Sequence, residues 1–249
     1  MNVTLEIQRF NPEDDKKPAF KKYSVTVDPT DRVLDALMDI SRNQDGTPVL
    51  RKSCAHGVCG SDAMRINGRE RLACKTLIQD VTDDDNTVIK VEPLRHLPIQ
   101  RDLMVDQNPF FDKYRSVKPF FFPDEMPEEK ENIQSQDERA MFDDATKCIN
   151  CSACYSACPV LDKNTNFIGP AAIVQAARFV FDSRDQGLEP RLGVLDTADG
   201  VWPCENHFEC TRVCPREIKV TKLINLTKRE IKKYREARGE KTAEPEESK

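Results

Sequence analysis

The stretch CINCSACYSACP, at residues 148–159, sets four cysteines in the spacing C-x2-C-x2-C-x3-C and follows the last one with a proline. This spacing is typical of bacterial chains that bind cubane iron–sulfur clusters. A second stretch, CENHFECTRVCP at residues 204–215, repeats the spacing but has His207 where the second cysteine would stand. Two matched runs that both end in Cys-Pro predict a domain built around two metal clusters.

The two runs predict ligands that cross between the clusters. In the bacterial pattern, three closely spaced cysteines hold one cluster and the fourth cysteine binds the other. One site, a [4Fe–4S] cluster, is then held by Cys148, Cys151, Cys154 and Cys214. The other site keeps only three thiolates, which suits a [3Fe–4S] cluster, and its predicted ligands are Cys158, Cys204 and Cys210. Zinc is the weaker alternative, because tetrahedral zinc sites do not require crossed pairing.

A third ligand set lies nearer the N-terminus, in CAHGVCGSD at residues 54–62, with Cys74 following later. Plant-type [2Fe–2S] sites use C-x4-C-x2-C and a more distant fourth cysteine. Here the spacing is kept, but Asp62 stands at the third position. Since a carboxylate oxygen can bind iron, the predicted ligands of a [2Fe–2S] cluster are Cys54, Cys59, Asp62 and Cys74.

The other residues of this loop fit the same interpretation. Gly57 and Gly60 suit a backbone that wraps closely around inorganic sulfur and points N–H groups at it. A zinc site that includes His56 is the alternative. The close ligand loop with a distant last cysteine argues against zinc, so we expect His56 to be a loop residue.

Residues 1–105 predict a small α+β domain that carries this loop. The segment VTLEIQ from Val3 alternates apolar and polar side chains as a half-buried strand does, and YSVTV from Tyr23 does the same, so the two predict a hairpin. Thr30 or Asp31 is then expected to cap a helix whose apolar face is Val33, Leu34, Leu37 and Ile40. Further strands are predicted at residues 64–66 and 88–94.

Three regions follow this domain. Residues 106–145 predict a connector with an aromatic part and then an acidic part, and the aromatic side chains are expected to brace the two domains rather than to dock on a partner. Residues 146–238 predict an all-α domain around the two cysteine runs, with helices near residues 173–181 and after Pro215. The polar residues 239–249 are predicted to be disordered.

The composition and the absent motifs narrow the function. The start of the chain resembles neither a signal peptide nor an organelle leader, so ten cysteines are expected to be reduced metal ligands rather than disulfides. No apolar stretch reaches the about 20 residues of a membrane span. No glycine-rich fingerprint for a flavin or nicotinamide follows a strand. Three clusters without a nucleotide site predict a chain that passes electrons between a redox partner and an acceptor.

The C-terminal part of the sequence is basic. Residues 215–241 contain ten Lys and Arg against four Glu, within a chain of net charge −5. A solvated helix face is the favoured explanation, and a surface that faces anionic lipid head groups is the alternative. We expect no nucleic-acid partner.

The order of the motifs, C-x4-C-x2-D-x11-C and then the two runs, resembles the iron–sulfur subunit of succinate dehydrogenase and of the related fumarate reductase. The resemblance covers nearly all of residues 1–236, including FIGPAA from Phe167 and DSRD from Asp182. It implies an N-terminal β-grasp plant-type ferredoxin domain that faces a flavoprotein with FAD. It also implies a helical bacterial-type ferredoxin domain that faces membrane anchor subunits, which bind quinone and in some members haem b.

The function that this resemblance implies is electron transfer within an oxidoreductase of the tricarboxylic acid cycle and respiratory chain. Electrons would run from FAD through [2Fe–2S], [4Fe–4S] and [3Fe–4S] to quinone, while the partner flavoprotein converts succinate to fumarate. The chain would lie on the inner face of a prokaryotic cytoplasmic membrane, held there by the anchors. A quinol:fumarate reductase running in reverse and a free soluble multi-cluster carrier are the alternatives. Asp62 favours succinate oxidation, because a number of succinate dehydrogenases carry it.

Two positions depart from the family pattern beside the third cluster. Many members have a Trp shortly after the first Cys-Pro and a His directly after the first cysteine of the second run, whereas this chain has VLDKNTN from Val160 and then Glu205. The nearby histidine is His207, at the vacant corner of the predicted [3Fe–4S] site. We expect it not to bind iron; imidazole ligation, and hydrogen bonding or proton donation to quinone, are the alternatives.

Overall fold

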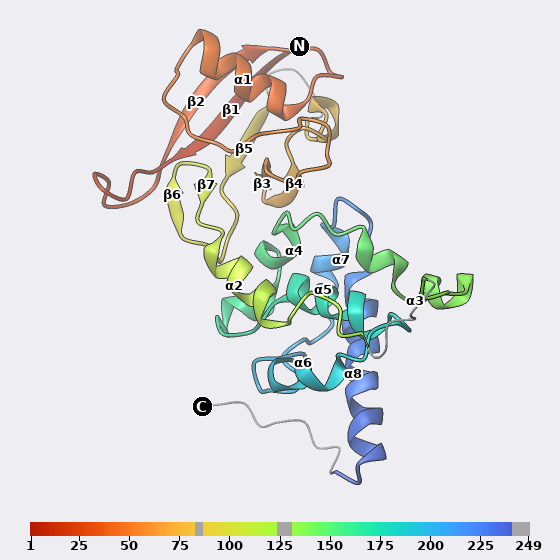
Figure 1. The fold of residues 1–249 in the computed structure, drawn as a ribbon. Coiled ribbons are helices and arrows are strands. Elements are labelled where there is room, and N and C mark those ends of the chain that lie inside the picture. The colour runs from red at the N-terminus through yellow and green to blue at the C-terminus, as the bar shows by residue number, and fades with distance from the viewer. Residues whose placement is uncertain (83–86, 124–130, 241–249) are drawn as a thin grey trace. The chain divides into compact units, whose positions relative to one another are not determined.

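The computed structural model describes residues 1–82, 87–123 and 131–240, which form two compact units. The first unit comprises Met1–Asn108 together with Ile149–Ala157, and the second comprises Pro109–Cys148 and Cys158–Lys249. The first unit contains a sheet and the second is helical (Figure 1). This confirms the mixed α and β composition and the order of the two regions along the chain.

The first unit is built on a five-stranded sheet in the order β2-β1-β5-β3-β4. The outer pairs β1–β2 and β3–β4 are antiparallel hairpins, whereas β1 and β5 run parallel. Side chains alternate along β1, so that Val3, Leu5 and Ile7 are all buried. The bounds of these elements are β1 Asn2–Arg9, β2 Ala19–Thr26, α1 Val33–Asn43, β3 Ala63–Ile66, β4 Arg69–Leu72 and β5 Val88–Glu92.

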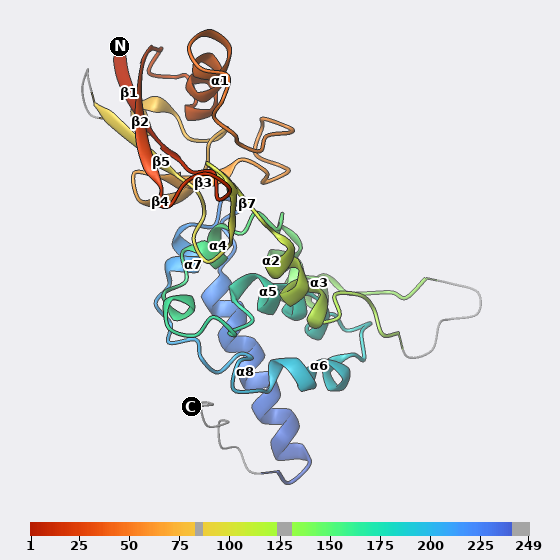
Figure 2. The same ribbon diagram turned by 90° about the vertical axis from the view of Figure 1, so that its left-hand side faces the viewer.

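Helix α1 lies against one face of this sheet (Figures 1 and 2). Its predicted apolar face is confirmed, because Val33, Leu34, Leu37 and Ile40 are all buried. The predicted cap is wrong: the residue before the helix is Arg32, whose N–H donates to Asp35 Oδ2 at 3.0 Å. Thr30 and Asp31 form a turn with Asp28 instead, in which the Thr30 hydroxyl donates to Asp28 Oδ1 at 2.6 Å and the Asp28 N–H donates to Asp31 Oδ2 at 2.8 Å.

The remaining elements of this unit are short and were not predicted. They are the 3-10 helix η1 Ile78–Asp80, the small sheet of β6 Ile99–Arg101 and β7 Met104–Val105, and the helix α4 Ala153–Ser156. The buried carboxylate of Asp102 joins three distant segments of the unit. It accepts from Arg9 Nε at 3.0 Å, from the Phe10 N–H at 2.9 Å and from the Val49 N–H at 2.9 Å.

The second unit packs around α5 and the long helix α8, which lie side by side (Figures 1 and 2). Ile173 of α5 and Ile224 and Ile231 of α8 are almost completely buried. Both predicted helices are therefore confirmed. The elements are α2 Asn108–Ser116, α3 Gln136–Thr146, η2 Pro159–Asp162, α5 Pro170–Val180, α6 Leu188–Leu195, α7 Glu209–Arg212 and α8 Val220–Ala237.

The predicted connector contains two helices, α2 and α3, and two of its aromatic rings contact side chains of α5 and α6 in the second unit. Phe121 meets Phe179 of α5 edge-on, with ring centroids 5.4 Å apart. The guanidinium of Arg191, in α6, lies 5.1 Å from the ring centroid of Phe122. The acidic part of the connector lies partly outside the described residues, as does most of the predicted tail at 239–249.

No helix in the described parts of the chain has both the length and the apolar character that crossing a membrane requires. The longest of them, α8, carries Lys222, Arg229 and Lys233 on exposed positions.

Candidate metal centres

The first predicted ligand set is gathered in the first unit, where the loop after α1 folds back on itself. The Cys59 N–H donates to Cys54 Sγ at 3.3 Å and the His56 N–H donates to the same sulfur at 3.5 Å. Hydrogen bonds from the backbone N–H groups of His56, Cys59 and Val58 lower the pKa of Cys54 to about 6. The loop therefore favours a thiolate at Cys54, which is the form that binds iron.

The one predicted ligand that is not a cysteine, Asp62, lies buried beside Cys74. Its side chain accepts a hydrogen bond at Oδ2 from the Cys74 N–H, at 2.5 Å. Its other oxygen, Oδ1, is buried and has no hydrogen-bond partner among the described residues. An unpaired buried carboxylate oxygen is costly unless it is compensated. Iron ligation at Oδ1 would supply that compensation, so this residue fits a cluster ligand.

Burial and the Asp62 carboxylate raise the pKa of the Cys74 thiol to about 12. Burial is the larger cause, because it penalises the charged thiolate, and the hydrogen bond and charge of Asp62 add to it. A metal reverses this balance, because a coordinating thiol is deprotonated outright. Cys74 and Asp62 thus fit a pair of neighbouring metal ligands.

Two glycines let the ligand loop pass close to its neighbours. Gly57 and Gly60 have φ angles of +81° and +68°, a left-handed backbone that side chains rarely adopt. A Cβ added at Gly60 would lie 2.6 Å from the Cβ of Cys151, and one at Gly57 would lie 2.6 Å from the side chain of Lys75. His56 turns its ring to its own loop, with Nδ1 2.6 Å from the Cys54 carbonyl oxygen.

The three predicted ligands of the [3Fe–4S] cluster come together in the second unit. Cys158, Cys204 and Cys210 line one cavity, together with His207 and Thr221. Burial raises the pKa of Cys158 to about 11, with further contributions from the nearby Cys210 and Cys204. Burial also raises the pKa of Cys210. Thiols from the first run and the second run thus share one site, as crossed ligation requires.

Lys228 of α8 holds the backbone next to this site. Its Nζ donates to the Cys204 carbonyl oxygen at 2.9 Å and to the Trp202 carbonyl oxygen at 3.3 Å. The hydroxyl of Thr221, also in α8, lies 3.5 Å from Cys210 Sγ. Sequence reasoning missed both residues. Only their position on the helix that follows the second run could have pointed to them.

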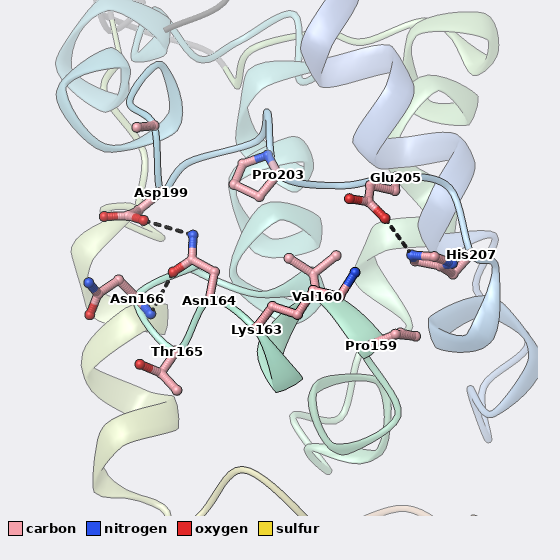
Figure 3. A pocket seen from close by; sticks show the side chains of 11 residues that line it. Pro159, Val160, Lys163, Asn164, Thr165, Asn166, Asp199, Pro203, Glu205 and His207 are labelled. Atoms are coloured by element: carbon pink, nitrogen blue, oxygen red, sulfur yellow. Dashed lines mark hydrogen bonds and ion pairs between the residues drawn. The ribbon is translucent and has the colours of Figure 1, made fainter. Parts of the chain in front are cut away.

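His207 borders both this cavity and a larger one of about 410 Å³. Its Nε2 lies 2.9 Å from Glu205 Oε2, and 42% of its side chain is exposed. Figure 3 shows this pair on one side of the larger cavity and the hydrogen-bonded pair of Asn164 and Asp199 on the other. Val160 lies between the two pairs. The cavity is thus mostly polar and opens directly beside the three-cysteine site.

The predicted [4Fe–4S] ligands are divided between the units. Cys151 and Cys154 belong to the first unit, whereas Cys148 and Cys214 belong to the second. Their common ligation stays a prediction from the spacing of the two runs. Within the described residues, no three His, Cys, Asp or Glu side chains converge on one point as a single metal ion would need. The ligands of a cluster differ in this respect, because they bind different iron atoms.

Comparison with known protein families supports two cluster domains. Residues 4–112 match the model of a 2Fe-2S iron-sulfur cluster binding domain. Residues 144–218 match the model of a 4Fe-4S dicluster domain. The two matches together span every cysteine of the chain.

Curated relatives match along most of the chain. The fumarate reductase iron-sulfur subunit of Mycobacterium tuberculosis is 41% identical over 218 residues, which cover 87% of each chain. The succinate dehydrogenase iron-sulfur subunit of Coxiella burnetii is 38% identical over 231 residues, which cover 92% of this chain and 97% of the relative. Among solved structures, a chain of the Mycobacterium smegmatis Sdh1 complex in the apo form is 28% identical. It matches with a TM-score of 0.80 over 93% of this chain and 96% of that one.

Proposed function

We propose that this chain, which belongs to the family of succinate dehydrogenase and fumarate reductase iron–sulfur subunits, passes electrons from the FAD of a flavoprotein subunit to a membrane quinone. It is thus the electron-transfer subunit of an oxidoreductase, and the chemistry on succinate belongs to the flavoprotein. When bound, the clusters supply one-electron redox centres. The residues of this chain would hold those clusters through their cysteine and aspartate side chains.

The strongest support for this proposal is the position of three cysteines in the second unit. Cys158 of the first run lies with Cys204 and Cys210 of the second run at a single cavity. This convergence supports crossed ligation and, because only three thiols meet there, a [3Fe–4S] cluster at that place. The unpaired Asp62 Oδ1 supports the [2Fe–2S] assignment in the same way. The proposed sets are Cys54, Cys59, Asp62 and Cys74 for [2Fe–2S]; Cys148, Cys151, Cys154 and Cys214 for [4Fe–4S]; and Cys158, Cys204 and Cys210 for [3Fe–4S].

We also propose that the N-terminal domain, residues 1–105, is a β-grasp ferredoxin domain. Its parallel β1–β5 pair at the centre of the sheet and the helix α1 between β2 and β3 support this. The helical ferredoxin domain would then occupy residues 146–238, after the connector.

The proposed partners are a flavoprotein subunit and one or more membrane anchor subunits that bind quinone and, in some complexes, haem b. The family's iron–sulfur subunits are peripheral, membrane-associated proteins, and we place this chain on the inner face of a cytoplasmic membrane. The match to 87% or more of relatives that are named as subunits favours a subunit over a free soluble carrier.

Succinate oxidation is the proposed direction of turnover. Quinol:fumarate reduction is the second candidate, because relatives at 41% and 39% identity are fumarate reductase subunits. His207 is the proposed residue nearest the quinone, since it lies at the edge of both cavities.

Purification of the native complex from membranes tests the subunit proposal. We expect the chain to bring a flavin-containing subunit and a hydrophobic anchor with it. Electron paramagnetic resonance (EPR) of the oxidised complex should show a three-iron signal that disappears on reduction. A chain that purifies alone from the soluble fraction, or one that shows only two-iron and four-iron signals, would contradict the proposal.

A further inference from the structure

Two threonine hydroxyls form a chain that ends on the sulfur of Cys210. Thr221 Oγ1 lies 3.5 Å from Cys210 Sγ, and Thr211 Oγ1 lies 3.0 Å from Thr221 Oγ1. Thr211 Oγ1 also accepts a hydrogen bond from the Thr221 N–H, at 3.0 Å. Thr221 is 1% exposed and Cys210 is 8% exposed, so the contact between these two side chains is shielded from water.

The direction of these hydrogen bonds follows once Cys210 is a cluster ligand, which rests on the proposed function. An iron-bound thiolate has no S–H and can only accept. Thr221 must therefore donate its hydroxyl hydrogen to Cys210 Sγ if the sulfur is to have a partner there. Thr211 in turn donates to Thr221 Oγ1, while its own oxygen is held by the Thr221 N–H. Each group then has a partner, and successive O–H groups polarise one another.

We propose that Thr221, supported by Thr211, donates a hydrogen bond to the Cys210 thiolate and thereby raises the reduction potential of the [3Fe–4S] cluster. Reduction adds one electron and so increases the negative charge on the sulfurs. A donor aimed at a sulfur stabilises the reduced form more than the oxidised form, and hydrogen bonds to the sulfurs are among the factors that set cluster potentials. Thr221 is thus a positioning residue that acts through Cys210.

The test is a redox titration of the purified complex in which EPR follows the three-iron signal. Thr221→Val removes the hydroxyl with little change of shape, so the midpoint potential should fall. At a fixed potential, we expect the ratio of reduced to oxidised cluster to fall about fivefold. This corresponds to a fall of ~40 mV in the midpoint potential of a one-electron couple. Thr221→Ser keeps the hydroxyl and should keep the wild-type midpoint. Pulsed measurements before and after transfer to D2O should show one exchangeable proton coupling fewer in Thr221→Val than in the wild type.

Thr227→Val is the matched control on the same helix. Thr227 is also buried, but its hydroxyl donates to the Leu223 carbonyl oxygen at 2.9 Å, so the midpoint should not move. The midpoint of the [2Fe–2S] cluster in the same samples should also stay unchanged. If the complex with Thr221→Val does not accumulate, Thr211→Val is the deciding variant. It removes the supporting hydroxyl and should also lower the midpoint potential of the three-iron cluster.

The possible outcomes distinguish a failure of the hydroxyl chain from a failure of the proposed cluster assignment. An unchanged three-iron midpoint in Thr221→Val, or in Thr211→Val where that variant decides, would overturn the hydroxyl chain and leave the cluster assignment standing. An equal shift in Thr227→Val would also overturn it, because the effect would then come from the helix in general. A wild-type complex without any three-iron signal would overturn the cluster assignment itself, and with it this inference.

Discussion

Asp62 departs from the usual all-cysteine set of a plant-type [2Fe–2S] site. Oδ2 is tied to the Cys74 N–H, and Oδ1 is buried without a partner among the described residues. These two oxygens have different roles: one shapes the loop and the other is free to bind iron. The same carboxylate helps to raise the pKa of Cys74, which iron must overcome on ligation.

Asp62→Ala should therefore abolish most of the [2Fe–2S] cluster, because it removes a ligand and leaves the Cys74 N–H without its acceptor. Asp62→Asn keeps an acceptor for that N–H but loses the anionic oxygen, so it should also lose cluster. Asp62→Cys restores a thiolate ligand and should keep the cluster. Iron content and the EPR signal of the reduced two-iron cluster are the measurements. Full cluster content in Asp62→Ala would contradict the assignment.

We expect His207 not to bind iron, and its proposed role is to act on quinone. His207→Ile should leave the three-iron signal intact and slow quinone reduction by about tenfold or more, because a positioned proton donor is lost. The electron-transfer rate to an artificial acceptor should stay the same. Glu205→Gln is the control for the contact with His207, since it keeps a side chain that can hydrogen-bond to the imidazole but removes the carboxylate.

A lost three-iron signal in His207→Ile would show that the imidazole binds iron. An unchanged quinone rate would leave His207 without a role in the reaction.

Single residues differed in how far the sequence could predict them. The cysteine sets could be predicted because the spacing of ligands along the chain follows from the geometry of a cluster loop. Thr221 could not be predicted, because its hydroxyl finds Cys210 only when α7 and α8 pack together. Whether a hydroxyl faces a sulfur or a helix carbonyl, as in Thr227, depends on tertiary structure alone.

At the scale of elements, a buried ion pair between Arg191 of α6 and Asp185 lies beside residues 118–122 of the aromatic part of the connector. Arg191 and Asp185 both have side chains with 0% exposure, and their nearest atoms are 2.6 Å apart. Arg191 also donates to the carbonyl oxygens of Lys118 at 3.2 Å and of Phe120 at 2.7 Å. The guanidinium thus fixes the segment that carries Phe121 and Phe122 within the second unit.

Arg191→Met should destabilise the second unit by about 3–5 kcal/mol, because it leaves Asp185 buried without a counter-charge. The temperature at which the purified complex loses its clusters should fall by ~10 °C. Arg115→Met is the matched control: its ion pair with Asp112 is exposed on both sides, so its effect should stay within about 1 kcal/mol.

A double variant separates the charge from the packing. Arg191→Met combined with Asp185→Leu removes both charges and should recover part of the lost stability. If the double variant melts no higher than Arg191→Met, the unpaired carboxylate is not the cause.

Elements with a clear periodicity were predicted correctly. The alternation of β1 and the apolar face of α1 were both visible in the sequence. The start of α1 was not, because Thr30 and Asp31 prefer a turn with Asp28 over capping the helix. The helices α2 and α3 were missed because the first is rich in aromatic residues and the second is strongly polar, so neither shows a clean apolar stripe.

At the scale of the whole molecule, the low hydrophobic content of 38% is consistent with cores that clusters help to fill. Metal ligands must be deprotonated to bind, and the unfolded chain rarely holds a preformed site, so cluster binding and folding are coupled. The thiols at Cys74 and Cys158, whose pKa values are raised to about 12 and about 11, illustrate this coupling. Each is held in a buried place that disfavours a thiolate unless iron is present.

Electrons from succinate are proposed to reach a [3Fe–4S] cluster on this chain. The decisive experiment is EPR of the purified complex, recorded as oxidised and again after succinate is added. We expect a three-iron signal in the oxidised sample that disappears with succinate, while a reduced two-iron signal appears. A three-iron signal that persists after succinate, in a complex that dithionite reduces fully, would show that succinate does not reduce this cluster.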